Sequence, residues 1–167
     1  MKSVRCPLGM ALLLSLCLHV RMVHAASWWN DEDYVHGISV VPVPDLAIGL
    51  LAGTVLFVDT REPEEYAEKH IPGAINIRLV DVDGVDAQPL QKYQYVVPYC
   101  LKDFRGFEVA RALREYKGLS NVVMMAPSGM KGWESQGLPL SSSNAEGMRK
   151  LAEWHKNSAL TVTESQP

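Results

Sequence analysis

One cysteine, Cys100, stands where a run of β-type residues (95–99) gives way to a predicted helix that starts near Gly106. The residues between must turn sharply, and successive backbone N–H groups in such a turn point inward and can hold an anion. The helix N-terminus adds free N–H groups, and Lys102 and Arg105 add positive charge. A thiol in this setting is expected to exist largely as a nucleophilic thiolate, which can also accept a sulfur atom as a persulfide. Spacing alone leaves open an inert cysteine packed in the core.

The first 25 residues have the features of a secretory signal peptide. A positively charged start leads into an apolar run (8–20), and Val23-His24-Ala25 places small residues at the spacing of a cleavage site. The run is shorter than the ~20 residues that a spanning helix needs, so an uncleaved membrane anchor is the weaker alternative. We therefore expect an exported protein, periplasmic if its source is bacterial, with no stable membrane insertion after cleavage.

Cleavage would also remove two of the three cysteines, Cys6 and Cys17. Exported domains usually pair their cysteines as disulfides. Cys100 would have no partner within the mature chain, so it is either an inert core residue or a reactive one.

The composition excludes several classes of function. The chain of 167 residues is long enough for one ordinary domain, and its 16 Lys+Arg against 19 Asp+Glu do not favour a nucleic-acid partner. The sequence has no Gly-rich phosphate motif and no Ser/His/Asp arrangement. Its histidines lack the spacing of metal ligands. We expect no metal and no organic cofactor, and the sequence does not indicate the oligomeric state.

Strands and helices alternate along the chain. This alternation predicts an α/β fold with a mostly parallel sheet and helices on both faces, in which Cys100 lies at the carboxyl edge of the sheet. The predicted strands are 39–41, 55–58, 74–77, 95–99 and 122–125, and the predicted helices are 45–51, a short one from Pro63, 106–116, 130–136 and one from Ser143.

The predicted organisation has four parts. After the signal peptide (1–25) come a polar and aromatic lead-in (26–37), a domain (38–140), and a final part (141–167) with a helix and a disordered tail from Asn157. The final helix either docks on the domain or engages a partner.

The part from 38 to 140 resembles the rhodanese homology domain. Three stretches carry the likeness: FVDTREPEEY at 57–66 with HIPGAINI at 70–77, Cys100 followed five positions later by Arg105, and GW at 132–133 with GLP at 137–139.

The resemblance implies a rhodanese-like three-layer fold and sulfurtransferase activity with Cys100 as the catalytic residue. The anion-binding loop would comprise Leu101, Lys102, Asp103, Phe104, Arg105 and Gly106, with Asp59 and Arg61 bracing it. The implied partners are a small sulfur-containing anion, such as thiosulfate, and a protein persulfide or thiol. A six-residue loop, Cys100 to Arg105, is the sulfurtransferase length, whereas related phosphatases have one more residue. A non-catalytic binding module and, less favoured, a phosphatase or arsenate-reductase-like enzyme are the alternatives.

Four residues depart from the family's usual pattern. Leu101 replaces an Arg, Asp103 replaces a Gly, and Phe104 is large enough to fill or cover the pocket. Glu65 stands where members that use thiosulfate often have an Arg. These departures predict that the protein uses small dianionic sulfur donors poorly.

Overall fold

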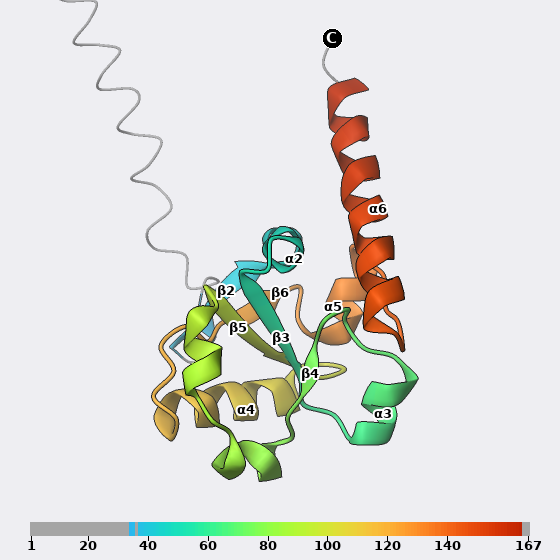
Figure 1. Cartoon of the computed structure of the whole chain (residues 1–167). Coiled ribbons are helices and arrows are strands. Elements are labelled where there is room, and N and C mark those ends of the chain that lie inside the picture. Colours follow the sequence, from blue (N-terminus) through green and yellow to red (C-terminus); the bar gives the residue numbers. More distant parts are fainter. Residues whose placement is uncertain (1–33, 36, 165–167) are drawn as a thin grey trace, which may run out of the picture. The chain divides into compact units, whose positions relative to one another are not determined.

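The computed structural model describes residues 34–35 and 37–164 (Figure 1). The predicted signal peptide and most of the lead-in lie outside the described residues. No helix in the described part is both long and apolar enough to cross a membrane.

The strands form two groups of three that meet in the middle of the fold. Their orders are β1-β2-β6 and β4-β3-β5, and every pairing except β1 with β2 is parallel. Val96 pairs in parallel with Val122 and joins the two groups. The strand bounds are β1 Tyr34–Val35, β2 Ile38–Pro42, β3 Val55–Asp59, β4 Ile75–Asn76, β5 Tyr95–Tyr99 and β6 Met124–Ala126.

Helices cover both faces of this sheet and make the three layers that the sequence predicts. Figure 1 shows α2, α5 and α6 on one side and α4 on the other. The bounds are α2 Val43–Leu51, α3 Pro63–Glu68, α4 Phe104–Glu115, α5 Gly129–Ser135 and α6 Asn144–Glu164, with 3₁₀ helices η2 Leu79–Gly84 and η3 Gln88–Lys92.

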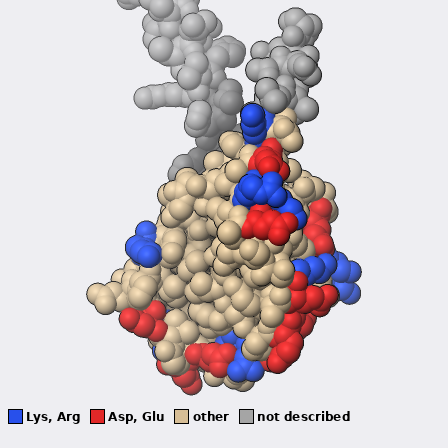
Figure 2. Space-filling model, turned by 45° about the vertical axis from the view of Figure 1, so that its right-hand side comes forward, with Lys and Arg blue, Asp and Glu red and all other residues tan. Residues whose placement is uncertain are grey.

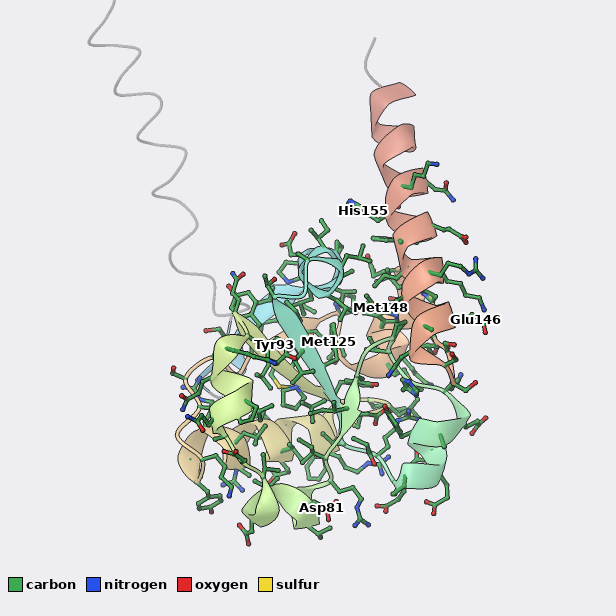
Figure 3. All side chains as sticks on the ribbon, in the orientation of Figure 1. Asp81, Tyr93, Met125, Glu146, Met148 and His155 are labelled. Atoms are coloured by element: carbon green, nitrogen blue, oxygen red, sulfur yellow. The ribbon has the colours of Figure 1, made fainter. Side chains whose placement is uncertain are left out.

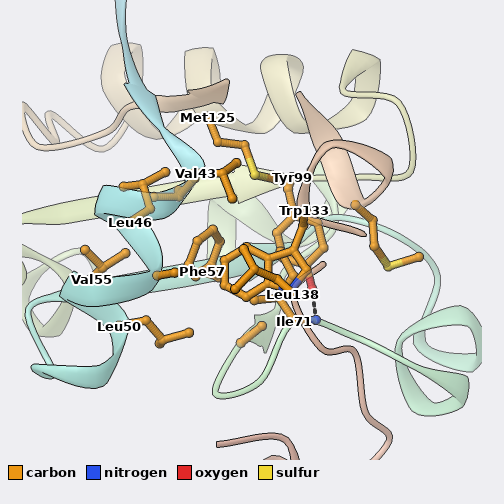
Figure 4. Close-up of a cluster of buried hydrophobic side chains, with 14 of the residues drawn as sticks. Val43, Leu46, Leu50, Val55, Phe57, Ile71, Tyr99, Met125, Trp133 and Leu138 are labelled. Atoms are coloured by element: carbon orange, nitrogen blue, oxygen red, sulfur yellow. Dashed lines mark hydrogen bonds between the residues drawn. The ribbon is translucent and has the colours of Figure 1, made fainter. Parts of the chain in front are cut away.

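Alternate residues of the central strands feed two separate apolar cores. All five residues of β3 are buried, as expected of a strand covered on both faces. Phe57 faces α2 and α5, and its ring lies edge-on to those of Trp133 and Tyr99 at centroid distances of 5.2 and 6.0 Å (Figure 4). Leu56 and Val58 enter the other core, which α4 and the 3₁₀ helices complete. The second core holds the middle and the last turn of α4 against the sheet.

The final helix is longer than predicted. Instead of an irregular tail from Asn157, α6 continues through Glu164, and no glycine or proline interrupts it after Gly147. Leu151 is fully buried in the core that contains α2, so α6 docks on the domain. Figure 3 places Met148 on the side of α6 toward the domain and Glu146 on the opposite side. Ion pairs one turn apart give the alternating charges seen along the exposed side of this helix in Figure 2.

Candidate active site

Cys100 follows directly on β5, at the carboxyl edge of the sheet, as the sequence predicts. It is a free cysteine and only 4% exposed. Its Sγ accepts a hydrogen bond from the backbone N–H of Asp103 at 3.0 Å. Its carbonyl oxygen accepts one from the N–H of Met130 at 2.8 Å. The loop therefore curls around the sulfur while the start of α5 holds its backbone.

The loop passes into α4 two residues earlier than predicted. Asp103 adopts a left-handed conformation (φ +89°), which turns the chain so that the helix begins at Phe104. The first backbone hydrogen bond of the helical pattern runs from the N–H of Phe107 to the carbonyl of Asp103, the residue that precedes α4, at 2.9 Å. The N–H groups of Phe104, Arg105 and Gly106 therefore have no acceptor within the helix and are available to an anion.

Gly106 lets α4 approach β5 closely beneath this loop. A Cβ atom there would lie 2.9 Å from Tyr99 Cα and 3.1 Å from the Pro98 carbonyl oxygen. Both contacts are with backbone, which cannot move aside cheaply. The position of α4, and with it the curvature of the loop, depends on the absence of a side chain at Gly106.

Replacing Gly106 by alanine should lower the free energy of unfolding by about 1–3 kcal/mol, the usual cost of forcing an extra methyl group into a packed site. Urea denaturation measures this change. Gly84→Ala is the matched control, because a Cβ at that exposed position meets nothing within 4 Å. Equal stability of the two variants would show that α4 has room to shift.

The carboxylate of Asp103 is buried under the loop. Both of its oxygens are inaccessible to solvent, and neither makes a hydrogen bond of good geometry. Burial raises the pKa of Asp103 to about 6, although the nearby backbone amides of Cys100 and Gly129 partly oppose this shift. The loop thus contains an acid that is costly to ionise.

Arg105 forms an ion pair with Glu65 of α3. Its two terminal nitrogens lie 3.1 and 3.4 Å from the carboxylate oxygens, and both side chains are roughly 40% exposed (42% and 39%). Hydrogen bonding to Arg105 lowers the pKa of Glu65, and the same bond is the main cause that raises the pKa of Arg105. The guanidinium expected to hold an anion already has a carboxylate partner. From the sequence, Glu65 was noted only as an acid at a position where related proteins often have an arginine. Its pairing with Arg105 was not predicted.

Asp59 and Arg61 form a buried ion pair with each other. Arg61 Nη2 lies 2.6 Å from an Asp59 oxygen, and it also donates to the carbonyl of Lys69. This pair fixes the junction between β3 and α3. The pair meets the surroundings of the Cys100 loop at two places: Glu65 lies 3.9 Å from Arg61, and Asp59 is the cross-strand partner of Tyr99 and interacts with its side chain.

Thr60 makes the more direct connection, and sequence reasoning missed it. Its N–H and its hydroxyl both donate to the Tyr99 carbonyl, at 2.9 and 3.0 Å. Tyr99 immediately precedes Cys100, so Thr60 secures the end of β5. The sequence does offer a signal for this contact: a small hydroxyl residue stands between Asp59 and Arg61, at the end of a neighbouring parallel strand.

The remaining loop side chains face outward. Leu101 and Lys102 are exposed, and Phe104 is 77% exposed. Phe104 and Arg105 line a pocket of about 210 Å³ together with Glu108 of α4, residues 78–80 at the start of η2, and Thr60 and Glu62 from the connection between β3 and α3. Phe104 thus forms an edge of this pocket. A larger hollow of about 640 Å³ runs along α4, but no residue of the Cys100–Gly106 loop lines it.

No three or more His, Cys, Asp or Glu side chains gather into a possible metal site within the part of the chain that the structure describes. His70 bonds instead to the Tyr66 carbonyl and to Asn144, whose side chain also accepts the N–H of Gly73. His70 therefore helps to fix the Ile-Pro-Gly turn that follows it.

Comparison with known proteins identifies the fold. A model of the rhodanese-like domain matches residues 44–136. An HTH-type transcriptional regulator of Mycobacterium tuberculosis is 34% identical over 99 residues, which are 58% of this chain and only 42% of the regulator. The chain therefore spans less than half the length of that relative.

Two solved structures have the same fold. A thiosulfate sulfurtransferase from Pseudomonas aeruginosa aligns with a TM-score of 0.56 and 24% identity, over 64% of this chain and 20% of that chain. A protein of unknown function from Rhodopseudomonas palustris, described as a possible tyrosine phosphatase, aligns with a TM-score of 0.52 and 20% identity, over 84% and 99% of the two chains. The family model covers more than half of the sequence and includes both Asp59 and the Cys100 loop, and on this ground the chain belongs to the rhodanese-like domain family.

Proposed function

We propose that this protein is a sulfurtransferase that carries a sulfane sulfur on Cys100. The observation that carries the proposal is the 3.0 Å hydrogen bond from the Asp103 N–H to Cys100 Sγ, at the point where α4 begins. A sulfur held by a backbone amide at a helix N-terminus is stabilised as an anion. Both the thiolate and the persulfide that it would form are anions.

The reaction would proceed in two displacements. The Cys100 thiolate attacks the outer sulfur of a donor such as thiosulfate, and sulfite leaves with the electron pair of the broken S–S bond. An acceptor such as cyanide or a thiolate then attacks the outer sulfur of the persulfide and releases the Cys100 thiolate. With cyanide the product is thiocyanate. Charge and atoms balance in both steps, with no oxidant consumed.

A non-catalytic binding module is the second candidate. It is favoured by the near-complete burial of Cys100 and by the ionisable Asp103 beneath its loop. A phosphatase is less well supported, because the six residues from Cys100 to Arg105 are one fewer than the related phosphatases use.

Intact-mass measurement tests the proposal. The full chain, incubated with thiosulfate or a thiosulfonate, should gain the mass of one sulfur atom and lose it again when cyanide is added. Cys100→Ser is the matched control and should gain no mass. Absence of a mass gain with every donor would reject the sulfurtransferase function and favour the binding module, whereas turnover of an aryl phosphate would favour the phosphatase.

A further inference from the structure

We infer that the sulfur donor is a small organic molecule with an uncharged apolar group, rather than a bare dianion such as thiosulfate. The inference rests on the proposed function and specifies its substrate class. It is carried by the pocket of about 210 Å³ beside the Cys100 loop and by the ion pairs around it.

The cations near this pocket already have carboxylate partners. Arg105 is bound to Glu65, with a closest distance of 3.1 Å. Arg78, which lines the same pocket, lies 3.0 Å from Glu62 and 2.8 Å from Asp81. A small dianion would have to displace a carboxylate before it could bind either guanidinium. The ion pairs therefore weaken the binding of small dianions, which unpaired arginines would favour.

Lys102 is the cation of the loop that makes no ion pair in the described part of the chain. It is exposed and does not line the pocket. Its charge can attract anions of any shape toward the loop, but it adds no contact that would recognise one. Lys102 thus supports the approach of a negatively charged sulfur without favouring a dianion.

Three large apolar side chains stand out on the pocket wall, beside the charged side chains of Glu62, Arg78, Arg105 and Glu108. Leu79 and Val80 of η2 are 48% and 75% exposed, and Phe104 at the start of α4 is 77% exposed. Large apolar residues that stand out together beside a site mark a place where a ligand or partner is bound. The pocket is smaller than the ~300–1,000 Å³ typical of drug-sized ligands. Its size suits a single ring or a short alkyl chain better than a protein surface.

Cys100 does not itself line the pocket, but two neighbours in the loop connect the apolar wall to its sulfur. Phe104 follows Asp103, whose N–H is bonded to Cys100 Sγ. Arg105 lines the pocket and also interacts electrostatically with Cys100. A donor whose outer sulfur reaches Cys100 can therefore place its organic group against Phe104, Leu79 and Val80.

The first experiment compares donors that differ in one feature. Methanethiosulfonate and benzenethiosulfonate carry the same single charge, and each transfers its outer sulfur to the Cys100 thiolate with release of a sulfinate. We expect kcat/KM for benzenethiosulfonate to exceed that for methanethiosulfonate by at least ~10-fold after correction for their rates with a free thiol, because apolar contacts commonly discriminate by such factors. Thiosulfate should be the poorest of the three donors.

Two variants assign the preference to the pocket. Val80→Ser should lower the ratio of kcat/KM values between benzenethiosulfonate and methanethiosulfonate. Ile48→Ser, a control at a 47% exposed residue of α2 outside the pocket, should leave this ratio unchanged.

A third variant tests the ion pair. Glu65→Gln frees Arg105 and should raise kcat/KM for thiosulfate about two- to fivefold, as expected for a half-exposed ion pair.

The outcomes separate the inference from the proposed function. If thiosulfate loads Cys100 as fast as benzenethiosulfonate, or if Val80→Ser and Ile48→Ser have the same effect on the ratio, the apolar substrate class is wrong while the sulfurtransferase function stands. If no donor loads Cys100, the function itself is wrong, and the inference fails with it.

Discussion

Replacing Asp103 by asparagine should raise the free energy of unfolding by about 3 kcal/mol at pH 8 and by only about 0.5 kcal/mol at pH 4. The expected gain comes from removing a buried charge that no hydrogen bond of good geometry compensates. Asparagine keeps the shape of the side chain and also tolerates the left-handed backbone that Asp103 adopts. The substitution therefore changes the charge and little else.

The pH dependence follows from the two pKa values of Asp103. Its pKa is about 6 in the folded protein, against an ordinary value of 3.8. Between these values the folded protein binds more protons than the unfolded chain, so its stability falls as the pH rises. Below the lower value both states are protonated and ionisation costs nothing. Above the upper value the cost is complete, and a shift of about two units corresponds to about 3 kcal/mol.

Urea denaturation of both proteins at several pH values between 4 and 8 measures this effect. Asp83→Asn is the matched control, because Asp83 is exposed on η2 and makes no side-chain hydrogen bond; its stability should change by no more than about 0.5 kcal/mol at any pH. A gain for Asp103→Asn that is the same at pH 4 and pH 8 would show that shape, and not ionisation, is responsible.

The sequence predicts the layered α/β fold because its signals are local and mutually consistent. The apolar run from Val55 to Val58 has no polar face, so only a strand covered on both sides can accommodate it. The carboxyl end of β5 then places Cys100 at the sheet edge, since parallel strands end on the same side. Both conclusions need only periodicity and the turn residues between elements.

The details of the site depend on side-chain directions that periodicity does not determine. The Glu65–Arg105 pair joins residues 40 positions apart, on the first turns of two helices. Their meeting depends on how α3 and α4 are oriented at the sheet edge. Asp103 was expected at the turn, but the direction of its carboxylate, beneath the loop and away from solvent, follows from its left-handed backbone. The local sequence does not determine distances between helices or the directions of side chains. Neither the Glu65–Arg105 pair nor the burial of the Asp103 carboxylate could therefore be predicted.

Replacing Arg61 by methionine should lower the free energy of unfolding by about 3–5 kcal/mol, the cost of leaving a buried charge without its partner. Methionine fills much of the volume of the arginine stem, but Asp59 is fully buried and would lose the guanidinium that bonds both of its oxygens. The Lys69 carbonyl would lose a donor at the same time. Because the pair fixes the junction between β3 and α3, the loss should appear as a lower urea midpoint for the whole domain.

Arg149→Met provides the matched control for this prediction. Arg149 also lies 2.6 Å from its carboxylate partner, Glu153, but both side chains are 60% exposed, whereas those of Arg61 and Asp59 are 5% and 0% exposed. Water solvates an exposed charge that loses its partner, so the control should cost no more than about 0.5 kcal/mol. The double variant Asp59→Asn/Arg61→Met should recover part of the stability lost by Arg61→Met, because it removes the orphaned charge. Similar losses for Arg61→Met and Arg149→Met would mean that burial does not determine the value of the Asp59–Arg61 pair, and that water reaches Asp59 when the arginine is removed.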